Sequence, residues 1–304
     1  MAVPMRSTDF RGIVEPILNE AFDGVYDQRA DEWKSVFREQ KGIPRNYHEE
    51  PVLFGFGAAP ELPDGMPVTY RAGGTLFIAR YVYKVFGLAF ALTKVLVEDG
   101  DHIRIGQVYS RHLAQSLIET KETLCANIIN RAFNASYTGG DGQVLCGTSH
   151  PISGGTFSNL LTTAAVLSQT SVENLLIQVR NAVDNNGKRI RLTPKKLVVS
   201  PSNVFQAEVI LKSVLRTGAA NNDVNPVNSM GLLKDGQANL SRMTSTTAWF
   251  IQTDAPEGLK LMTRRGLEKS MEGDFDTDSM RYKSTERYIP GWTDPRGVWG
   301  TAGV

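Results

Sequence analysis

The longest regular pattern of apolar and polar positions in the chain runs from Gly106 to Phe133. Apolar residues recur there at helical spacing and form two adjoining ridges, while polar residues fall on the opposite face. The ridges are Leu113, Leu117, Leu124 and Ile128, and Ala114, Ile118, Cys125, Ile129 and Ala132; the polar face is Arg111, Gln115, Glu119, Glu122 and Asn130. At 1.5 Å per residue such a helix is about 42 Å long. The pattern predicts an amphipathic spine that carries a sheet or other helices along its length.

Two strand patterns precede this helix. Val52–Phe56 and Thr75–Phe86 are rich in β-branched and aromatic residues. The segment between them has three prolines and repeated glycine, and it is too long for a tight turn. The pattern predicts a long two-stranded flap, which is marginal in water unless something covers it. We expect the cover to be another subunit, contacted through Phe54, Phe56, Leu62, Pro63, Met66 and Tyr70.

The pattern of the N-terminal region predicts an arm that is not the start of a core. Ser7–Asp9 offers an N-cap for a helix that Pro16 must kink or restart. A short amphipathic element is expected at Asp31–Gly42, and Ala89–Asp99 is expected to lead into the spine.

The second half of the chain predicts a small α/β unit over residues 160–262. The expected elements are a helix over Ser171–Asp184, a strand over Lys196–Ser200, a helix from Pro201, and strands over Ala248–Thr253 and Gly258–Thr263. A polar loop, Thr217–Gly231, interrupts them. The fold class is α+β.

Composition excludes several classes of protein. The 33 basic and 32 acidic residues give no basic excess of the kind that a dedicated nucleic-acid binder shows. One dense basic cluster comprises Lys188, Arg189, Arg191, Lys195 and Lys196. We interpret it as a solvated strand edge, and a phosphate contact is the alternative. Two cysteines argue against a disulfide scaffold. The start resembles no signal peptide, and the most apolar window, Val82–Val97, contains two lysines. We expect a soluble protein in a reducing compartment, with no membrane partner.

Few residues of the chain match a catalytic or metal-binding motif. Cys146 and His150 are the most tempting pair, as a thiolate with its base or as two metal ligands, but a zinc site needs three or four ligands. The alternative is a turn in which His150 bonds local backbone. Asp274, Asp276 and Asp278 have the spacing of a calcium loop, yet the required Gly and Glu are missing. No catalytic residue, cofactor or metal is expected.

Several stretches together resemble a known family. They are GLAFALTKVLVED (87–99), TKETLCANIINRAF (120–133), YTGGDGQVLCGTSHP (137–151), LTPKKLVVSPSN (192–203), AWFIQTDAP (248–256) and RYIPGWTDPRGVWG (287–300). In this order they are similar to the major capsid proteins of tailed bacteriophages, in particular the Mu-like major head subunit family. The resemblance covers nearly the whole chain, and it rests on the order and spacing of weakly specific motifs.

The resemblance implies the HK-97-like capsid-shell fold. The arm would be about residues 1–48, the extended β-hairpin loop or flap 49–86, and the peripheral domain 87–159 with the spine helix 106–133, returning at 263–304. The axial α/β domain would be 160–262. The resemblance also places one loop near the capsomer axis, through Gly218, Asn221, Asn222, Asn225 and Asn228.

The implied function is structural. The subunit would self-assemble into hexamers and pentamers of an icosahedral shell that encloses phage DNA through non-specific contacts, in the virion and, during assembly, in the host cytoplasm. The resemblance implies three partners: a separate scaffolding protein, a maturation protease and a portal. Some family members have a long N-terminal scaffolding region, and its lack here implies either a separate scaffolding protein or an already processed chain. An encapsulin-type cargo shell shares the fold and is the alternative; an orphan α/β enzyme using Cys146 and His150 is the third possibility.

Overall fold

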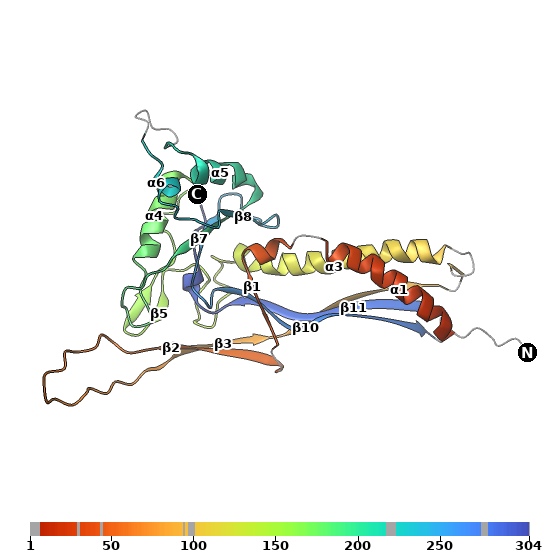
Figure 1. Ribbon diagram of the computed structural model, residues 1–304, viewed down its shortest axis with the longest axis horizontal. Helices are drawn as coiled ribbons and strands as arrows, with labels where there is room; N and C mark the ends of the chain where they lie inside the picture. The colour runs from red at the N-terminus through yellow and green to blue at the C-terminus, as the bar shows by residue number, and fades with distance from the viewer. Residues whose placement is uncertain are drawn as a thin grey trace, which may run out of the picture.

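The computed structural model of the chain describes residues 7–28, 31–42, 45–93, 95–96, 101–216, 223–274 and 279–303. Figure 1 shows three parts: a long body that runs across the view, an upright body at its left end, and a hairpin that extends to the left below both. We call them the spine layer, the α/β layer and the flap.

The spine layer contains a four-stranded sheet. Its strands, in order across the sheet, are β1 (Arg38–Lys41), β10 (Leu259–Asp274), β11 (Ser279–Trp292) and β4 (Lys84–Leu92). β1 is parallel to β10, and the other neighbours are antiparallel. Along β11 buried and more exposed positions largely alternate, because one face of the sheet packs on helices and the other does not.

The spine helix α3 (His102–Asn130) confirms the predicted pattern, although it begins before Gly106 and ends before Phe133. Gly106 lies inside the helix because another chain segment approaches it closely. A Cβ added there would lie 2.9 Å from Cδ2 of Leu18. Both apolar ridges contribute buried residues, so the helix lies along the sheet as expected.

One residue of the predicted polar face was assigned wrongly. Glu122 is buried, and its Oε2 accepts a hydrogen bond from the backbone N–H of Trp33 at 3.0 Å. Trp33 belongs to the short 3-10 helix η1 (Glu32–Ser35), which packs against α3. The arm therefore covers a stretch of the spine that helical periodicity alone assigned to solvent.

The N-terminal helix α1 (Ser7–Tyr26) is continuous, with Pro16 inside it. Of the two predicted alternatives, a kink at Pro16 or a second helix that begins there, the second is wrong. Val14, Leu18 and Phe22 of α1 are buried in a core shared with α3, β10 and β11. Packing of this apolar face outweighs the hydrogen bond that a proline removes from a helix.

The flap is formed by β2 (Tyr47–Phe54) and β3 (Gly74–Val82), which pair antiparallel. The predicted strand over Thr75–Phe86 is in fact β3 and the first part of β4, separated at Tyr83, where the chain changes its partner from β2 to β11. The expected lead-in at Ala89–Asp99 is strand as far as Leu92.

The α/β layer has a second four-stranded sheet, in the order β12 (Val298–Thr301), β9 (Trp249–Thr253), β7 (Pro194–Val199) and β8 (Gln237–Asn239). Its helices are α4 (Gln169–Arg180), α5 (Val204–Lys212), which follows the 3-10 turn η2 (Pro201–Asn203), and α6 (Pro226–Ser229). Ser168 caps α4 by accepting a hydrogen bond from the backbone N–H of Ser171. A separate apolar core that includes Val172, Leu197 and Trp249 holds this layer together.

Two features connect the layers. β10 begins beside β1 and runs on through the expected boundary at residue 262, and β12 returns from β11, through the turn η3 (Pro295–Gly297), into the sheet of the α/β layer. The small hairpin β5 (His150–Ile152) and β6 (Gly155–Phe157) lies before α4. The chain thus passes between the two layers several times.

Candidate functional site

The tip of the flap is the most exposed apolar segment of the described chain. Beyond the last β2–β3 pair, Phe54 with Gly74, residues 55–73 form no strand. Of the six flap residues predicted from the sequence, Phe54 is half-buried and the other five are exposed, with Tyr70 97% exposed. The tip encloses an open hollow of about 470 Å³ lined largely by apolar side chains. Such a surface gains about 25 cal/mol for each Å² of apolar area that another molecule covers.

The flap is not free along its whole length. The turn after α4 contacts the first strand and the start of the tip. Nδ2 of Asn185 donates to the carbonyl of Leu53 at 2.8 Å, and Nζ of Lys188 donates to the carbonyl of Phe56 at 2.8 Å. The expectation of a flap without cover from its own chain is therefore wrong at Leu53 and at Phe56, where the tip begins.

The root of the flap contains a partly buried ionic cluster with the buried Lys260 at its centre. Glu50 of β2 accepts hydrogen bonds at one carboxylate oxygen from Nζ of Lys260 and from Oγ1 of Thr293. Its other oxygen lies 2.8 Å from Nε2 of His48. Lys260, which is 3% exposed, also pairs with Glu257. Burial alone would raise the pKa of Glu50, but the hydrogen bonds from Lys260 and Thr293 hold that pKa below its usual range.

A tyrosine completes the root. The hydroxyl of Tyr81, on β3, donates to the backbone carbonyl of Trp292 at 2.5 Å and lies 2.7 Å from Oγ1 of Thr293. Burial raises the pKa of this hydroxyl, so it stays a donor. Both strands of the hairpin are therefore fixed to the spine layer by buried polar groups.

Cys146 and His150 are both buried, and the turn is built differently from the expectation. The His150 ring bonds side chains instead of local backbone: Nδ1 lies 2.6 Å from Oδ2 of Asp141, and Nε2 lies 3.1 Å from Oδ1 of Asn159. Because the amide nitrogen of Asn159 donates to three carbonyls, its oxygen faces the ring. Both ring nitrogens are thus occupied, and neither is available to accept a proton from a thiol.

The thiols are equally unsuited to catalysis. Cys125 and Cys146 are free and buried, and burial raises the pKa of both thiols. Since the thiolate is the reactive form, neither cysteine has the environment of a nucleophile. Among the described residues no group of three or more His, Cys, Asp and Glu side chains is placed to hold a metal ion. Asp276 and Asp278 lie outside the described residues.

The loop expected at the capsomer axis is described in part. Gly218, Asn221 and Asn222 lie outside the described residues. Asn225 is buried, caps α6 and donates to the carbonyl of Ile210 at 2.8 Å, so its side chain serves its own chain. Asn228 donates to the carbonyls of Lys212 and Ser213. The axial placement of the loop stays a prediction.

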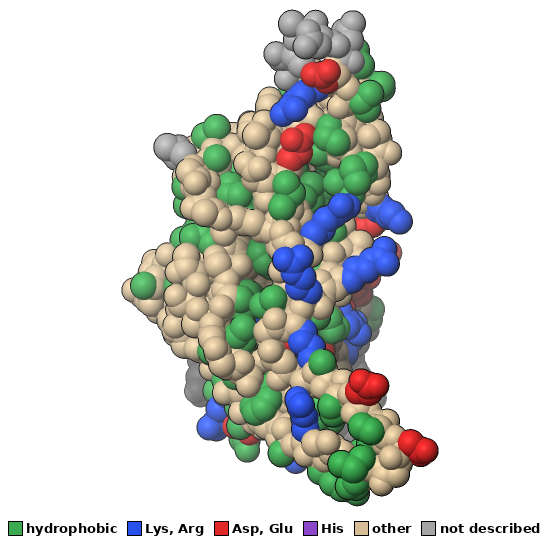
Figure 2. All heavy atoms as spheres, turned by 90° about the vertical axis from the view of Figure 1, so that its left-hand side faces the viewer, with side chains coloured by type: hydrophobic (Ala, Val, Ile, Leu, Met, Phe, Trp, Pro, Cys, Tyr) green, Lys and Arg blue, Asp and Glu red, His purple; other side chains and the backbone are tan. Residues whose placement is uncertain are grey.

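Basic side chains follow one edge of the molecule. Figure 2, which looks at the end with the flap tip, shows Lys and Arg side chains in a row from the α/β layer down toward the flap. Of the predicted basic cluster, Lys188, Arg189, Arg191 and Lys195 are exposed. Lys196 is half-buried, and its Nζ donates to the carbonyl of Ser35 at 2.6 Å. The solvated reading therefore fits most of the cluster.

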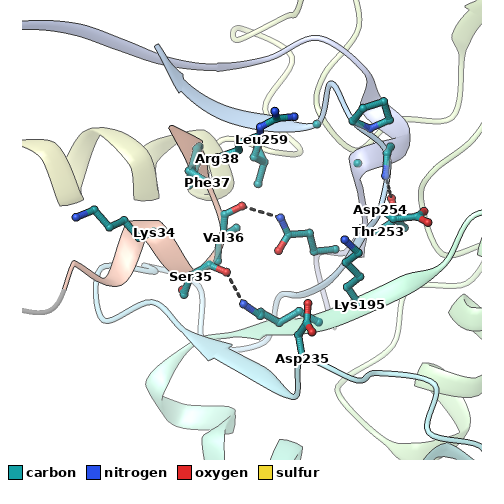
Figure 3. A pocket seen from close by; sticks show the side chains of 16 residues that line it. Lys34, Ser35, Val36, Phe37, Arg38, Lys195, Asp235, Thr253, Asp254 and Leu259 are labelled. Carbon is teal, nitrogen blue, oxygen red and sulfur yellow. Dashed lines mark hydrogen bonds between the residues drawn. The ribbon is translucent and has the colours of Figure 1, made fainter. Parts of the chain in front are cut away.

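The Lys196 contact belongs to a polar cleft of about 330 Å³ between the arm and the two sheets (Figure 3). Nε2 of Gln252 donates across it to the carbonyl of Val36 at 2.6 Å. These hydrogen bonds fix the arm against the α/β layer, which is a structural task. No described helix is long and apolar enough to cross a bilayer.

Comparisons with known proteins agree with this picture. A family model described as phage capsid protein matches residues 80–300. No curated protein matches the chain in sequence.

Solved capsids share the fold. The capsid of cyanophage P-SCSP1u aligns with a TM-score of 0.55 at 13% identity, covering 91% of this chain and 89% of that one. The mature capsid of bacteriophage PhiM1 aligns with a TM-score of 0.54 at 10% identity, covering 90% of this chain and 87% of that one. A virus-like particle from Pyrococcus furiosus aligns with a TM-score of 0.51 at 11% identity, covering 94% of this chain and 98% of that one. At these identities the likeness shows the HK-97-like fold alone. Because the family model spans most of the chain, however, the protein belongs to the phage capsid protein family and is a structural component of the virion capsid.

Proposed function

We propose that this chain is the major head subunit of a tailed phage and that it self-assembles into hexamers and pentamers of an icosahedral shell around the phage DNA. One observation carries the proposal: the flap tip presents exposed Phe56, Leu62, Met66 and Tyr70, and no strand of the described part of the chain pairs with it. A contiguous apolar surface of this kind marks a site of protein–protein contact.

The contrast between root and tip supports self-association. The partly buried cluster around Glu50 fixes where the hairpin leaves the body, so the tip is held out from it instead of folding back. A surface held at a defined position away from its own body is suited to reach a neighbouring copy. Contacts between identical subunits that are not self-complementary generate rings when the rotation between subunits closes, and open filaments when it does not.

The remaining assignments are part of the proposal and rest on the resemblance to the capsid proteins of tailed phages. A scaffolding protein, a maturation protease and a portal are the proposed partners, with assembly in the host cytoplasm. The exposed basic side chains near Lys188 and Arg191 offer non-specific contacts to DNA phosphates. The same proposal includes membership of the Mu-like subfamily and the division into arm, flap, peripheral and axial domains. It also includes the position of the loop 217–231 near the capsomer axis.

An encapsulin-type cargo shell is the second candidate because it shares the fold; the likeness to the Pyrococcus furiosus virus-like particle shows that fold alone and does not separate the two candidates. The match to the phage capsid family favours the phage shell. Neighbouring terminase and portal genes would support the phage shell, whereas a neighbouring gene for a cargo enzyme would support the alternative.

Electron microscopy of the purified protein tests the proposal directly. We expect closed icosahedral particles built from five-fold and six-fold capsomers, with residues 217–231 near the capsomer axes. Protein that stays monomeric at high concentration, with and without a scaffolding protein, would contradict shell formation. A reconstruction with the loop far from any axis would remove the axial assignment alone.

A further inference from the structure

The long strand β10 is irregular at one place. Its pairing with β11 shifts register between Thr263 and Arg265 and again between Arg265 and Glu268, while the pairs on both sides of this stretch run without interruption. A bulge of this kind re-aims the side chains that it contains, and bulges are frequent next to functional sites. The stretch (TRRGLE) contains two adjacent arginines. It lies near the root of the flap, because Arg264 donates to Asn46, the residue before β2.

Three arginines meet at this bulge. Arg265 lies directly opposite Arg287 of β11 in the register of the sheet. Nη1 of Arg264 and Nη2 of Arg287 both donate to Oδ1 of Asn46, at 3.3 Å and 2.5 Å. Like charges directly opposite each other destabilise an antiparallel pair, and one neutral oxygen compensates two guanidinium groups poorly. The arrangement therefore concentrates positive charge at a cost to the folded subunit.

The carboxylates of the surrounding elements do not balance this charge. Glu268 pairs with Arg265 at 3.1 Å, but neither Arg264 nor Arg287 forms an ion pair with a described residue. Glu286, next to Arg287 in sequence, is buried and pairs with Lys121 of α3, on the other face of the sheet. The other acidic residues nearby are paired elsewhere: Glu39 with Lys41, Glu49 with Arg80, and Glu50 with Lys260.

Two further cations add to the positive charge. Arg45 precedes Asn46, and Lys84 lies opposite Tyr288, the residue after Arg287. Both side chains are exposed, and neither forms an ion pair with a described residue. Because Asn46 is exposed as well, the point where the guanidinium groups meet is open to a small ion from solvent.

The donors at the bulge outnumber their acceptors. A guanidinium has five N–H donors, and Nε of Arg265 and Nε of Arg287 are both buried without a hydrogen-bond partner. The buried hydroxyl of Tyr83, between β3 and β4, has no partner either. Buried donors without an acceptor are costly, so their clustering indicates a ligand that accepts hydrogen bonds. The acceptors that the three arginines reach are Oδ1 of Asn46, Oγ1 of Thr285 and the carboxylate of Glu268.

Tyr83 is suited to such a ligand. Burial and the charge of Glu50 raise the pKa of Tyr83 to about 12, whereas the charge of Arg264 lowers this pKa. The hydroxyl therefore keeps its proton at neutral pH, and it is a donor on which the charge of Arg264 acts.

We propose that Arg264, Arg265 and Arg287 form a binding site for a tetrahedral oxyanion of the class of inorganic phosphate. Guanidinium forks match the oxygens of phosphate and form charge-assisted hydrogen bonds with them. A phosphate dianion has enough oxygens to accept from three arginines at once, and its charge offsets the repulsion between Arg265 and Arg287. A phosphodiester of nucleic acid has a single charge and fewer free oxygens, so it fits this compact cluster less well. The site goes beyond the proposed function, because it belongs to the single subunit and requires no shell.

Titration of unassembled subunits with inorganic phosphate tests the proposal. The ionic strength is held constant with sodium chloride, at neutral pH. We expect isothermal titration calorimetry to show saturable binding of about one phosphate per chain, and the midpoint of thermal unfolding to rise until the site is full.

Three variants assign the binding to these side chains. Arg287→Gln and Arg264→Gln each remove one guanidinium, and we expect each to weaken phosphate binding at least ten-fold. Without phosphate, the Arg287→Gln subunit should be no less stable than the unmodified chain, because the repulsion with Arg265 is gone. Lys283→Gln removes the same charge from an exposed position on the same strand and is the matched control; it should bind phosphate like the unmodified chain.

Three results would overturn the site. An equal effect of phosphate on the arginine variants and the unmodified chain would show the general stabilisation that phosphate salts give to folded proteins. Binding of a short oligonucleotide without terminal phosphates, in the absence of phosphate binding, would assign the arginines to nucleic acid. Arginine variants that fail to form particles, from a chain that binds no phosphate, would assign them to a carboxylate of a second copy. Absence of particles from the unmodified chain would instead contradict the proposed function alone.

Discussion

The tip and the root of the flap are parts of one hairpin, yet they are built by opposite physical means. At the root, Glu50, Lys260 and Thr293 are largely buried and satisfy one another's hydrogen bonds. At the tip, Leu62, Met66 and Tyr70 are exposed apolar groups. A buried ion pair is costly unless it is fully satisfied, and exposed apolar area is costly unless it is covered. The first requirement is met within the subunit, and the second is left for an assembly to meet.

This difference separates two properties that a mutation can change. Substitutions at the root act on the free energy of unfolding of the subunit, because they disturb groups buried inside it. Substitutions at the tip act on assembly, because the tip contributes few contacts to its own fold. The four predictions that follow test this separation.

The largest effect is expected from removing the tip. Deletion of residues 58–73 removes the apolar hollow and exposed Tyr70 but leaves β2, β3 and the root. We expect a folded subunit with an unchanged far-UV circular dichroism spectrum and no closed particles in electron micrographs. Shells like those of the intact chain would show that the tip is dispensable.

Loss of the root cation comes next. Lys260→Met keeps much of the side-chain volume and leaves the partly buried Glu50 without its main partner. Breaking a buried pair from one side costs roughly 3 to 5 kcal/mol. We expect denaturant unfolding of unassembled subunits to show a loss of this size. Lys283→Met, on an exposed side chain of the neighbouring strand, is the control and should cost less than about 0.5 kcal/mol.

Acid should weaken the root by a smaller amount. Because the pKa of Glu50 is lower in the folded chain than in the unfolded one, its contribution to stability is complete above the unfolded value near pH 4.3 and disappears as the pH falls through the lower, folded value. We expect the protection of the β2 and β3 amides, measured as the exchange rate relative to the intrinsic rate at the same pH, to fall over this window.

Two variants isolate that carboxylate. Glu50→Gln should lose most of the acid-dependent part of the exchange, whereas Glu49→Gln, which changes an exposed neighbour on the same strand, should keep it. An identical acid response in all three proteins would place the titrating group elsewhere.

The sequence predicted those elements whose pattern is local. The spine helix follows from its apolar ridges, and the exposed flap tip follows from a proline- and glycine-rich segment between two strand patterns. Glu122 and Pro16 were misjudged because contacts with distant segments, Trp33 in one case and the α3 core in the other, outweigh local preference. The periodicity of apolar residues along the chain does not indicate which distant segments will pack together.

The root cluster was missed for the same reason. Glu50, Lys260 and Thr293 are separated by more than 200 residues from the first to the last, and a single sequence gives no signal that a strand glutamate and a strand lysine meet. His150 shows the intermediate case. Its neighbourhood was singled out, but its bonds to Asp141 and Asn159 depend on how the Gly-rich connection folds.

The smallest expected effect concerns covalent bonds at the tip, where we expect none. Some capsids of this fold join subunits by an isopeptide bond from a flap lysine to an asparagine of a neighbour, which requires a neutral amine beside a carboxylate that takes its proton. From Pro51 to Tyr83 the flap contains no lysine, and its basic residues are Arg71 and Arg80. A guanidinium stays protonated and is a poor nucleophile, so Glu61 and Asp64 have no amine to activate.

Buried Cys125 and Cys146 likewise offer no thiol for a bond between subunits. Mature particles boiled in detergent, with or without reductant, should therefore run as single subunits of the 33.4 kDa calculated for the chain. A ladder of multimers that reductant does not remove would show an isopeptide-type bond, and a ladder that reductant removes would show an intersubunit disulfide; either would mean that the tip is held by more than the contacts of its exposed surface.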